Sequence, residues 1–162
     1  MLVVPDGSGE TLASIGITIR VYAKNYQGQP LPGIPAASIQ LRSTFLCICS
    51  NGNIADGPTD AGGSTTFSGV IRAGGCAASL AVLVDGIQIA TLPVKTRSPE
   101  MGTQSPCYID ASDESFSFRL GTKVGDGGST GYTICLDLNG DGYIDLSDVA
   151  RFSDYLGASC NP

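Results

Sequence analysis

Short stretches of alternating apolar and polar residues dominate the first 97 positions of the chain. ITIRVYAK, residues 17–24, alternates over eight positions, and SIQLR, residues 38–42, does so again with Ile39 and Leu41 on one side. A period of two directs one side of an extended chain toward a core and the other toward water. Both stretches are therefore predicted to be half-buried β-strands.

Further strands are predicted around turn sequences. FLCIC (45–49) is a short apolar run, and STTFSGVIR (64–72) follows a Gly-rich turn. LAVLVDGIQIATL (80–92) consists of two apolar runs joined by Asp85-Gly86, a pair typical of two-residue hairpin turns. Short strands separated by Gly- and Pro-rich turns predict a mainly β fold, an antiparallel sandwich.

Three segments of this region share a family pattern. They are ITIRVYAKNYQGQPLPGIP, PTDAGGSTTFSGVIRAGG and LAVLVDGIQIA, and they lie within roughly residues 10–95. They resemble the bacterial immunoglobulin-like domains, of the invasin type, that occur in surface and adhesion proteins. The resemblance implies an immunoglobulin-like antiparallel β-sandwich over residues 1–97 that acts as a spacer or binding module.

The charge is unevenly distributed along the chain. Residues 1–99 carry five acidic and six basic side chains, whereas residues 100–162 carry ten acidic and three basic ones. This asymmetry predicts two modules with different roles. The absence of a basic patch argues against a nucleic-acid partner. No apolar run approaches the roughly 20 residues of a membrane-spanning helix, and no signal peptide is visible, so no membrane insertion is expected.

The sequence contains no histidine. Ser-His-Asp and Cys-His nucleophile systems and histidine-bearing zinc sites are therefore excluded. The region of residues 1–97 also shows no paired carboxylates outside turns and no phosphate-binding glycine loop. We expect no enzymatic activity.

The acidic part contains the segment DLNGDGYIDLSD, residues 137–148, which has the pattern of a calcium loop. With Asp137 as position 1, oxygen-bearing residues occupy the positions that bind Ca²⁺ in such loops, including the backbone carbonyl of position 7. Gly142 at position 6 permits the sharp turn. The predicted ligands are Asp137, Asn139, Asp141, Tyr143, Asp145 and Asp148.

Position 12 is Asp148, where an ordinary EF-hand loop has Glu, and VARFSDYLG follows it. Together these residues resemble the calcium half-repeat of dockerin modules, and Leu146, Val149 and Phe152 are spaced as one face of a short helix. Dockerins carry two half-repeats, and YIDASD at 108–113 matches YIDLSD at 143–148. The resemblance implies a small α-helical, EF-hand or dockerin-like module over residues 98–162.

The first copy of the repeat has lost most of its ligand pattern. It spans residues 100–121, and a Gly-rich linker (121–131) separates it from the intact repeat (135–160). Asp110 and Asp113 keep positions 9 and 12, and Glu100 could reach the site only through an expanded loop. The residues at positions 1, 3 and 5 do not match the ligand pattern: they are Gly102, Gln104 and Pro106. One strong calcium site is therefore predicted.

Six cysteines without two closely spaced CxxC pairs predict disulfides and an oxidising compartment. We therefore expect a secreted protein, extracellular or at the cell surface. Cys135 and Cys160 bracket the intact half-repeat, so Cys135–Cys160 is the first predicted pair. Cys47 and Cys49 share a strand face and need different partners. The remaining predicted pairs are Cys49–Cys76 and Cys47–Cys107.

Two functions fit these observations. In the first, the protein is a self-assembling structural subunit of an extracellular filament or matrix. MLVV, at the start of the sequence, would then be a free strand that pairs with the sheet edge of the next subunit, giving a homo-oligomer through the chain termini. In the second, the calcium module docks the immunoglobulin-like domain onto a cohesin-like receptor or cell surface.

Overall fold

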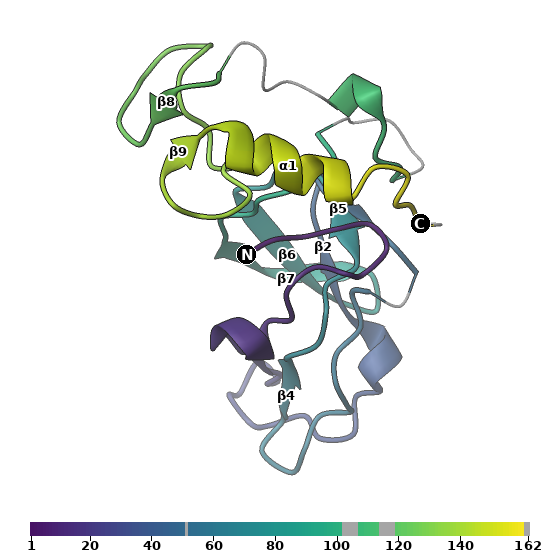
Figure 1. Cartoon of the computed structure of the whole chain (residues 1–162). Coiled ribbons are helices and arrows are strands. Elements are labelled where there is room, and N and C mark those ends of the chain that lie inside the picture. Colours follow the sequence, from purple (N-terminus) through teal and green to yellow (C-terminus); the bar gives the residue numbers. More distant parts are fainter. Residues whose placement is uncertain (51, 102–106, 114–118, 161–162) are drawn as a thin grey trace.

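The computed structural model describes residues 1–50, 52–101, 107–113 and 119–160, and it is built mainly from short antiparallel strands (Figure 1). Within these residues, four small sheets have the strand orders β1-β4, β2-β6-β7, β3-β5 and β8-β9. The strands are β1 (Ile19–Tyr22), β2 (Ile39–Arg42), β3 (Cys47–Ile48), β4 (Ser64–Phe67), β5 (Ala73–Gly74), β6 (Ser79–Val84), β7 (Ile87–Pro93), β8 (Thr122–Lys123) and β9 (Tyr143–Ile144).

Helical structure is limited among the described residues. The α-helix α1 (Leu146–Asp154) follows the candidate calcium loop, and the short 3-10 helices are η1 (Ala13–Ile15), η2 (Ala36–Ser38) and η3 (Ala111–Asp113). The described residues just before the loop form no helix, so the loop is not part of a complete helix–loop–helix EF-hand. Within the described residues, no helix is both long and apolar enough to cross a lipid bilayer.

The strands predicted from alternation are present in shortened form. β2 buries Ile39 and Leu41 completely, as the pattern predicts. Asp85 and Gly86 form the turn between β6 and β7, and both have positive φ, 48° and 78°, as a type I′ hairpin turn requires. The mainly β character is thus confirmed. The finer assignment, a complete immunoglobulin-like sandwich, stays a prediction.

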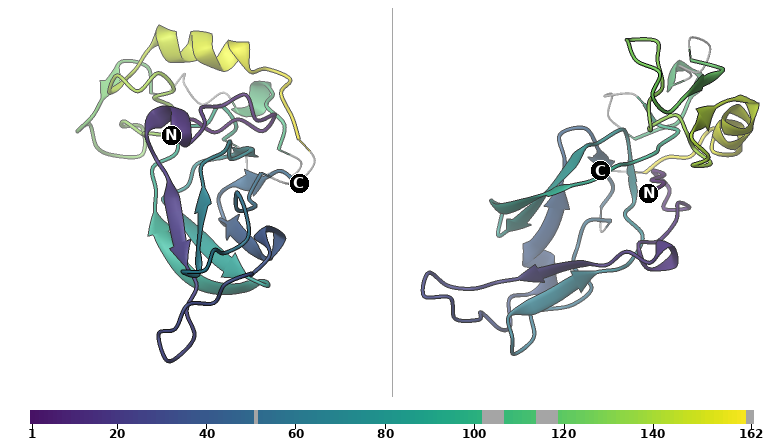
Figure 2. Two further views of the ribbon diagram at one scale, coloured as in Figure 1. Left: turned by 90° about the horizontal axis from the view of Figure 1, so that it is seen from below. Right: turned by 90° about the vertical axis from the view of Figure 1, so that its left-hand side faces the viewer.

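Two sheets face each other across the larger core (Figure 2). β1-β4 and β2-β6-β7 supply buried residues to one cluster, among them Val21, Phe67, Leu41 and Leu80. We refer to residues 10–97, which supply every buried residue of this cluster except Val3, as the sheet region. In β1, β2 and β4, alternate side chains are removed from water while those between them remain more exposed.

A second, smaller core lies beneath α1. It combines Ile109, Leu136, Leu138, Ile144 and Phe152 with two residues from the start of the chain. We refer to residues 98–160 as the loop region. The expected Gly-rich linker is part of it, because its residues Thr122 and Lys123 form β8 and pair with β9, which lies within the candidate calcium loop.

The segment MLVV lies between the two cores rather than free in solvent. Leu2 forms a parallel bridge with Arg97, the Val3 amide donates to the Arg97 carbonyl (2.9 Å), and Leu2, Val3 and Val4 are at most 4% exposed. Val3 packs in the core of the sheet region, whereas Leu2 and Val4 pack in that of the loop region. The prediction of a free strand for a neighbouring subunit is therefore wrong. Successive side chains of MLVV therefore pack into two different cores of the same chain.

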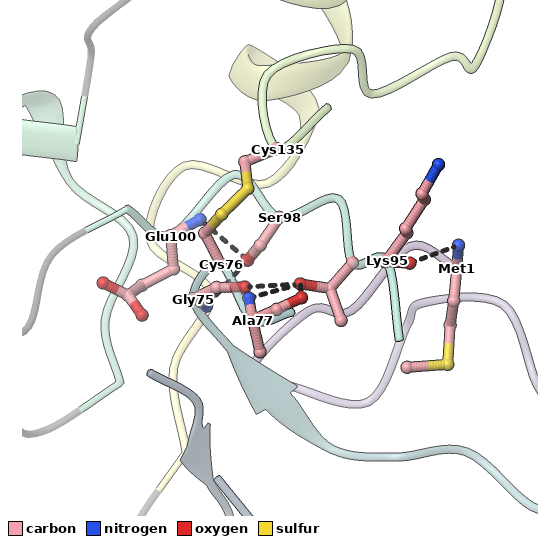
Figure 3. Close-up of a disulfide and its surroundings, with 9 residues drawn as sticks. Met1, Gly75, Cys76, Ala77, Lys95, Ser98, Glu100 and Cys135 are labelled. Carbon is pink, nitrogen blue, oxygen red and sulfur yellow. Dashed lines mark hydrogen bonds between the residues drawn. A yellow bond between two sulfur atoms is a disulfide. The ribbon is translucent and has the colours of Figure 1, made fainter. Parts of the chain in front are cut away.

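Three disulfides connect the sheet region to the loop region: Cys47–Cys107, Cys49–Cys160 and Cys76–Cys135. All six cysteines are paired. Cys47–Cys107 agrees with the prediction, whereas the predicted pairs Cys135–Cys160 and Cys49–Cys76 are wrong. Figure 3 shows Cys76–Cys135 beside Ser98, whose hydroxyl accepts a hydrogen bond from the Gly75 amide (3.0 Å).

The reasons for the two wrong pairs are geometric. α1 has nine residues and so advances about 13 Å, which carries Cys160 away from Cys135 to a position where its amide donates to the Cys107 carbonyl (3.1 Å). In the β3–β5 pair, Cys47 is opposite Gly74, so Cys76 lies about four residues, or roughly 13 Å, along the ladder from Cys49. A disulfide needs Cα atoms closer than about 7 Å, and the three observed pairs are all at 5.6 Å.

Candidate metal centre

The candidate calcium loop, residues 137–148, starts from the smaller core. Leu136 and Leu138 are buried there, and Asp137 between them is only 1% exposed. Gly140 and Gly142 have φ values of 83° and 91°, a region in which a Cβ atom is unfavourable. Gly142 thus provides the turn expected at position 6.

Asp137 accepts hydrogen bonds at both carboxylate oxygens. The Gly140 amide donates to Oδ1 (2.7 Å), and the Gly142 amide and the Tyr132 hydroxyl donate to Oδ2 (3.1 and 2.6 Å). Burial, together with this hydrogen bond to Asp137, raises the pKa of Tyr132 to about 12. The phenol therefore remains protonated at neutral pH and orients the first predicted ligand.

Asp148, the residue at position 12, joins the two ends of the loop. It is completely buried and accepts hydrogen bonds from the Asn139 amide (3.1 Å) and the Asp145 amide (2.9 Å). Burial raises the pKa of Asp148 despite these hydrogen bonds. A nearby cation would stabilise its ionised form, which is one sign that the loop suits a metal ion.

The other side-chain ligands are each ordered by the backbone that follows them. Asn139 Oδ1 accepts from the Asp141 amide (2.9 Å), and Asp141 Oδ1 accepts from the Tyr143 amide (2.9 Å). Asp145 caps α1 by accepting from the amide and the hydroxyl of Ser147 (2.8 and 2.7 Å), which lowers the pKa of Asp145. These local bonds curl the segment into a loop that ends in a helix.

The predicted ligands lie along one loop, but their carboxylates do not meet at a single point. Within the described part of the chain, no three of them bring one oxygen each within 4.8 Å of one another. The Asn139 side-chain amide instead donates to Asp141 Oδ2 (2.9 Å) and Ser147 Oγ (2.6 Å). Sulfur atoms of three cysteines do satisfy this spacing, but they belong to disulfides and are not thiolates: Cys49, Cys107 and Cys160.

The donor set fits Ca²⁺ better than other common metals. It consists of carboxylate oxygens, one amide oxygen and one backbone carbonyl, which are the hard ligands that Ca²⁺ prefers. Two of the carboxylates, those of Asp137 and Asp148, are buried, and a buried charge is costly without a compensating partner. An ion in the loop would supply that compensation.

Three supporting residues could not be found from the loop pattern. Tyr132 and Ser147 bind the ligand side chains, as described above. Arg97 comes from the sheet region and covers Gly140: a Cβ atom on this glycine would lie 3.0 Å from the Arg97 Cζ. A glycine at position 4 therefore lets a cationic side chain from the other region pack directly on the loop.

The first copy of the repeat keeps the second half of this geometry. Asp113 accepts from the Asp110 amide (2.9 Å), as Asp148 does from Asp145, and Asp110 accepts from the Ser112 amide (2.7 Å), as Asp145 does from Ser147. Asp113 also accepts from the amide of Met101 (3.1 Å), twelve residues earlier; in the intact loop the matching donor is nine residues before Asp148. The first loop is thus longer. Its positions Gly102, Gln104 and Pro106 lie outside the described residues.

The two copies are related by reciprocal hydrogen bonds. The Gly121 amide, at the end of the first copy, donates to the Ile144 carbonyl (2.8 Å), and the Gly157 amide, at the end of the second, donates to the Ile109 carbonyl (2.9 Å). Ile109 and Ile144 occupy the same place in the repeat. The match of YIDASD to YIDLSD is therefore a structural pairing in which each copy completes the other.

Comparisons with known proteins give little further information. No family model and no curated protein matches this chain. The chain is similar to a chain in the crystal structure of a type II cohesin–X-dockerin complex from Acetivibrio cellulolyticus, a C-terminal interface mutant. The two are 17% identical, with a TM-score of 0.32, over 88% of this chain and 96% of that one. A TM-score of this size does not define a shared fold.

Proposed function

We propose that this chain is a non-catalytic, calcium-binding module of an extracellular protein, and that it acts as a tether or structural brace. The observation that carries the proposal is the folded loop of residues 137–148, in which Asp137 and Asp148 are buried and the remaining ligand side chains are each held by a backbone amide. These hydrogen bonds are formed within the loop, and the loop leads directly into α1.

Five side chains and one carbonyl would hold the ion: those of Asp137, Asn139, Asp141, Asp145 and Asp148, with the Tyr143 carbonyl. A bound calcium ion supplies positive charge that offsets the mutual repulsion of the carboxylates. Asp148 would then connect the ion to the first turn of α1, and Leu136 and Leu138 would connect it to the smaller core. Calcium binding should therefore stabilise the loop region as a unit.

The disulfides support an extracellular, load-bearing role. All three link the sheet region to the loop region, with sequence separations of 60, 111 and 59 residues, and such bonds persist in oxidising compartments. A module that transmits force between a partner and a neighbouring domain benefits from covalent links between its parts. The absence of histidine from the sequence is consistent with a non-catalytic role.

Docking is the form of this proposal that we favour over self-assembly. Assembly through MLVV required a free strand, and that segment is paired and buried within its own chain. The resemblance of the intact loop and the following helix to a dockerin half-repeat favours a cohesin-like receptor as the partner. Sedimentation of the calcium-loaded chain should accordingly show a monomer; concentration-dependent polymers would favour the filament subunit instead.

Calorimetric titration of chelator-treated protein with CaCl₂ tests the metal site. One strong site is expected, and the double variant Asp137→Asn/Asp148→Asn should show no heat of binding. Asp154→Asn is the matched control, because Asp154 is an exposed carboxylate on α1 outside the loop; it should bind calcium like the unmodified chain. An intact protein without any heat of binding would refute the proposal.

A further inference from the structure

The two facing sheets of the sheet region leave an open groove on the side of β1 and β7. Two adjoining hollows of about 420 and 530 Å³ lie along it, and both are lined by Arg20 of β1 and Leu92 of β7.

Both walls of the groove are edge strands. Among the described residues, β1 pairs only with β4 and β7 pairs only with β6. Each strand therefore has an outer edge without a neighbouring strand, and such an edge is a template for another extended chain. A β-bulge opposite Val82 and Leu83 interrupts the alternation of β7, so that Ile89 and Ala90 both line the groove.

Much of the lining is apolar, and part of this apolar surface is accessible to solvent. Leu80 and Val82 line it and are buried, whereas Ile17, Leu31 and Ile89 remain 43%, 39% and 49% exposed. Such a cluster of exposed apolar side chains in a concave site is typical of an interaction surface. Alternate side chains of an added strand would enter the groove and cover this surface.

The charges on the groove have one sign. Arg20, Lys24 and Lys95 line it and are exposed, and no aspartate or glutamate is among its lining residues. The chain as a whole carries a net charge of −6, so this cationic lining is a local feature. Its complement is a segment with carboxylates next to its apolar residues.

We propose that this inter-sheet groove binds an extended β-strand of another polypeptide, with apolar side chains at alternate positions and carboxylates at its ends. The strand would complete the edge of β1 or β7 through backbone hydrogen bonds. β1 and β7 have four and seven residues, so a strand of about six residues, roughly 20 Å long, would span the groove.

A labelled nine-residue peptide with glutamate at both ends and valine and threonine in alternation tests the proposal by fluorescence anisotropy on the calcium-loaded chain. We expect saturable binding. The same peptide with alternate amides N-methylated should bind at least 10-fold more weakly, because it cannot donate the backbone hydrogen bonds. A peptide with lysine at both ends should also bind more weakly.

Two variants of the protein locate the binding site. Ile89→Lys should weaken binding of the peptide at least 10-fold, whereas Phe45→Lys, which changes an exposed apolar residue outside the groove (63% exposed), should leave it unchanged. No binding at millimolar peptide, or equal binding to both variants, would overturn the proposal. A dimer of the chain that Ile89→Lys dissociates and the peptide cannot displace would also overturn it, by assigning the groove to a second copy.

Discussion

Thirteen buried residues form the core of the sheet region, whereas seven form the core of the loop region, and two of those seven, Leu2 and Val4, come from the start of the chain. The sheets enclose enough apolar surface to drive their own formation. The loop region encloses little and relies on other devices: three disulfides, a paired repeat and, as we propose, calcium. A small core acquires a defined structure here by being attached to a larger one.

Removing the Cys76–Cys135 disulfide should destabilise the loop region much more than the sheet region. The bond closes a sequence separation of 59 residues, for which chain entropy alone corresponds to about 4 kcal/mol. In Cys76→Ser/Cys135→Ser we expect the amides of the loop region to exchange faster with solvent, while β2 and β6 keep their protection. Equal loss of protection in both regions, measured by hydrogen exchange, would contradict the division into two unequal cores.

Truncating one leucine in each core should show that only the smaller core is coupled to calcium binding. Leu41→Ala and Leu136→Ala each remove a fully buried side chain and should lower the free energy of unfolding by about 3 kcal/mol. Only Leu136→Ala should also weaken calcium binding, at least 10-fold, because Leu136 anchors the chain next to Asp137. Denaturant titrations and calorimetry measure the two effects. Equal calcium affinity in both variants would argue against a coupling between the smaller core and the loop.

The adjacent valines of MLVV provide a matched pair of substitutions for comparing the core of the sheet region with that of the loop region. Val3 and Val4 are 1% and 0% exposed but pack in different cores. Each change to alanine should cost about 2 kcal/mol. Val4→Ala should accelerate exchange at the Ile109 and Gly157 amides, which Val3→Ala should leave protected. The opposite pattern would mean that the segment does not divide its side chains between the cores.

The smallest expected effect concerns pH and the sheet region. Burial tends to raise the pKa of Asp56, but hydrogen bonds from Thr66 and Ser68 outweigh it and hold the pKa below its ordinary value of 3.8. The ionised carboxylate therefore stabilises the fold above pH 3.8, and this contribution is lost as the pH falls through the lower folded-state pKa. Asp56→Asn should cost about 0.5 kcal/mol at pH 7, because the site is exposed, and urea unfolding should show the difference shrinking as the pH falls below 3.8.

Local features were predictable because they depend on residues close in sequence. The β6–β7 turn needs only Asp85 and Gly86 at positive φ, and β2 needs only its alternation. The candidate calcium loop is similar: Gly142 turns the chain, and each of Asn139, Asp141 and Asp145 is held by an amide two residues further on. The internal repeat was visible because both copies use the same six-residue pattern to make the same local bonds.

The tertiary structure alone decided which distant segments meet. Sequence spacing favoured Cys135–Cys160, yet α1 separates these residues, and the docking of the two regions brings Cys160 to Cys49 and Cys135 to Cys76. The same docking turns MLVV from an apparent free strand into a segment shared by two cores, and places Arg97 on Gly140. An alternating pattern predicts which side chains are buried, but it does not predict the core in which they pack. The choice of core depends on contacts between residues almost 100 positions apart.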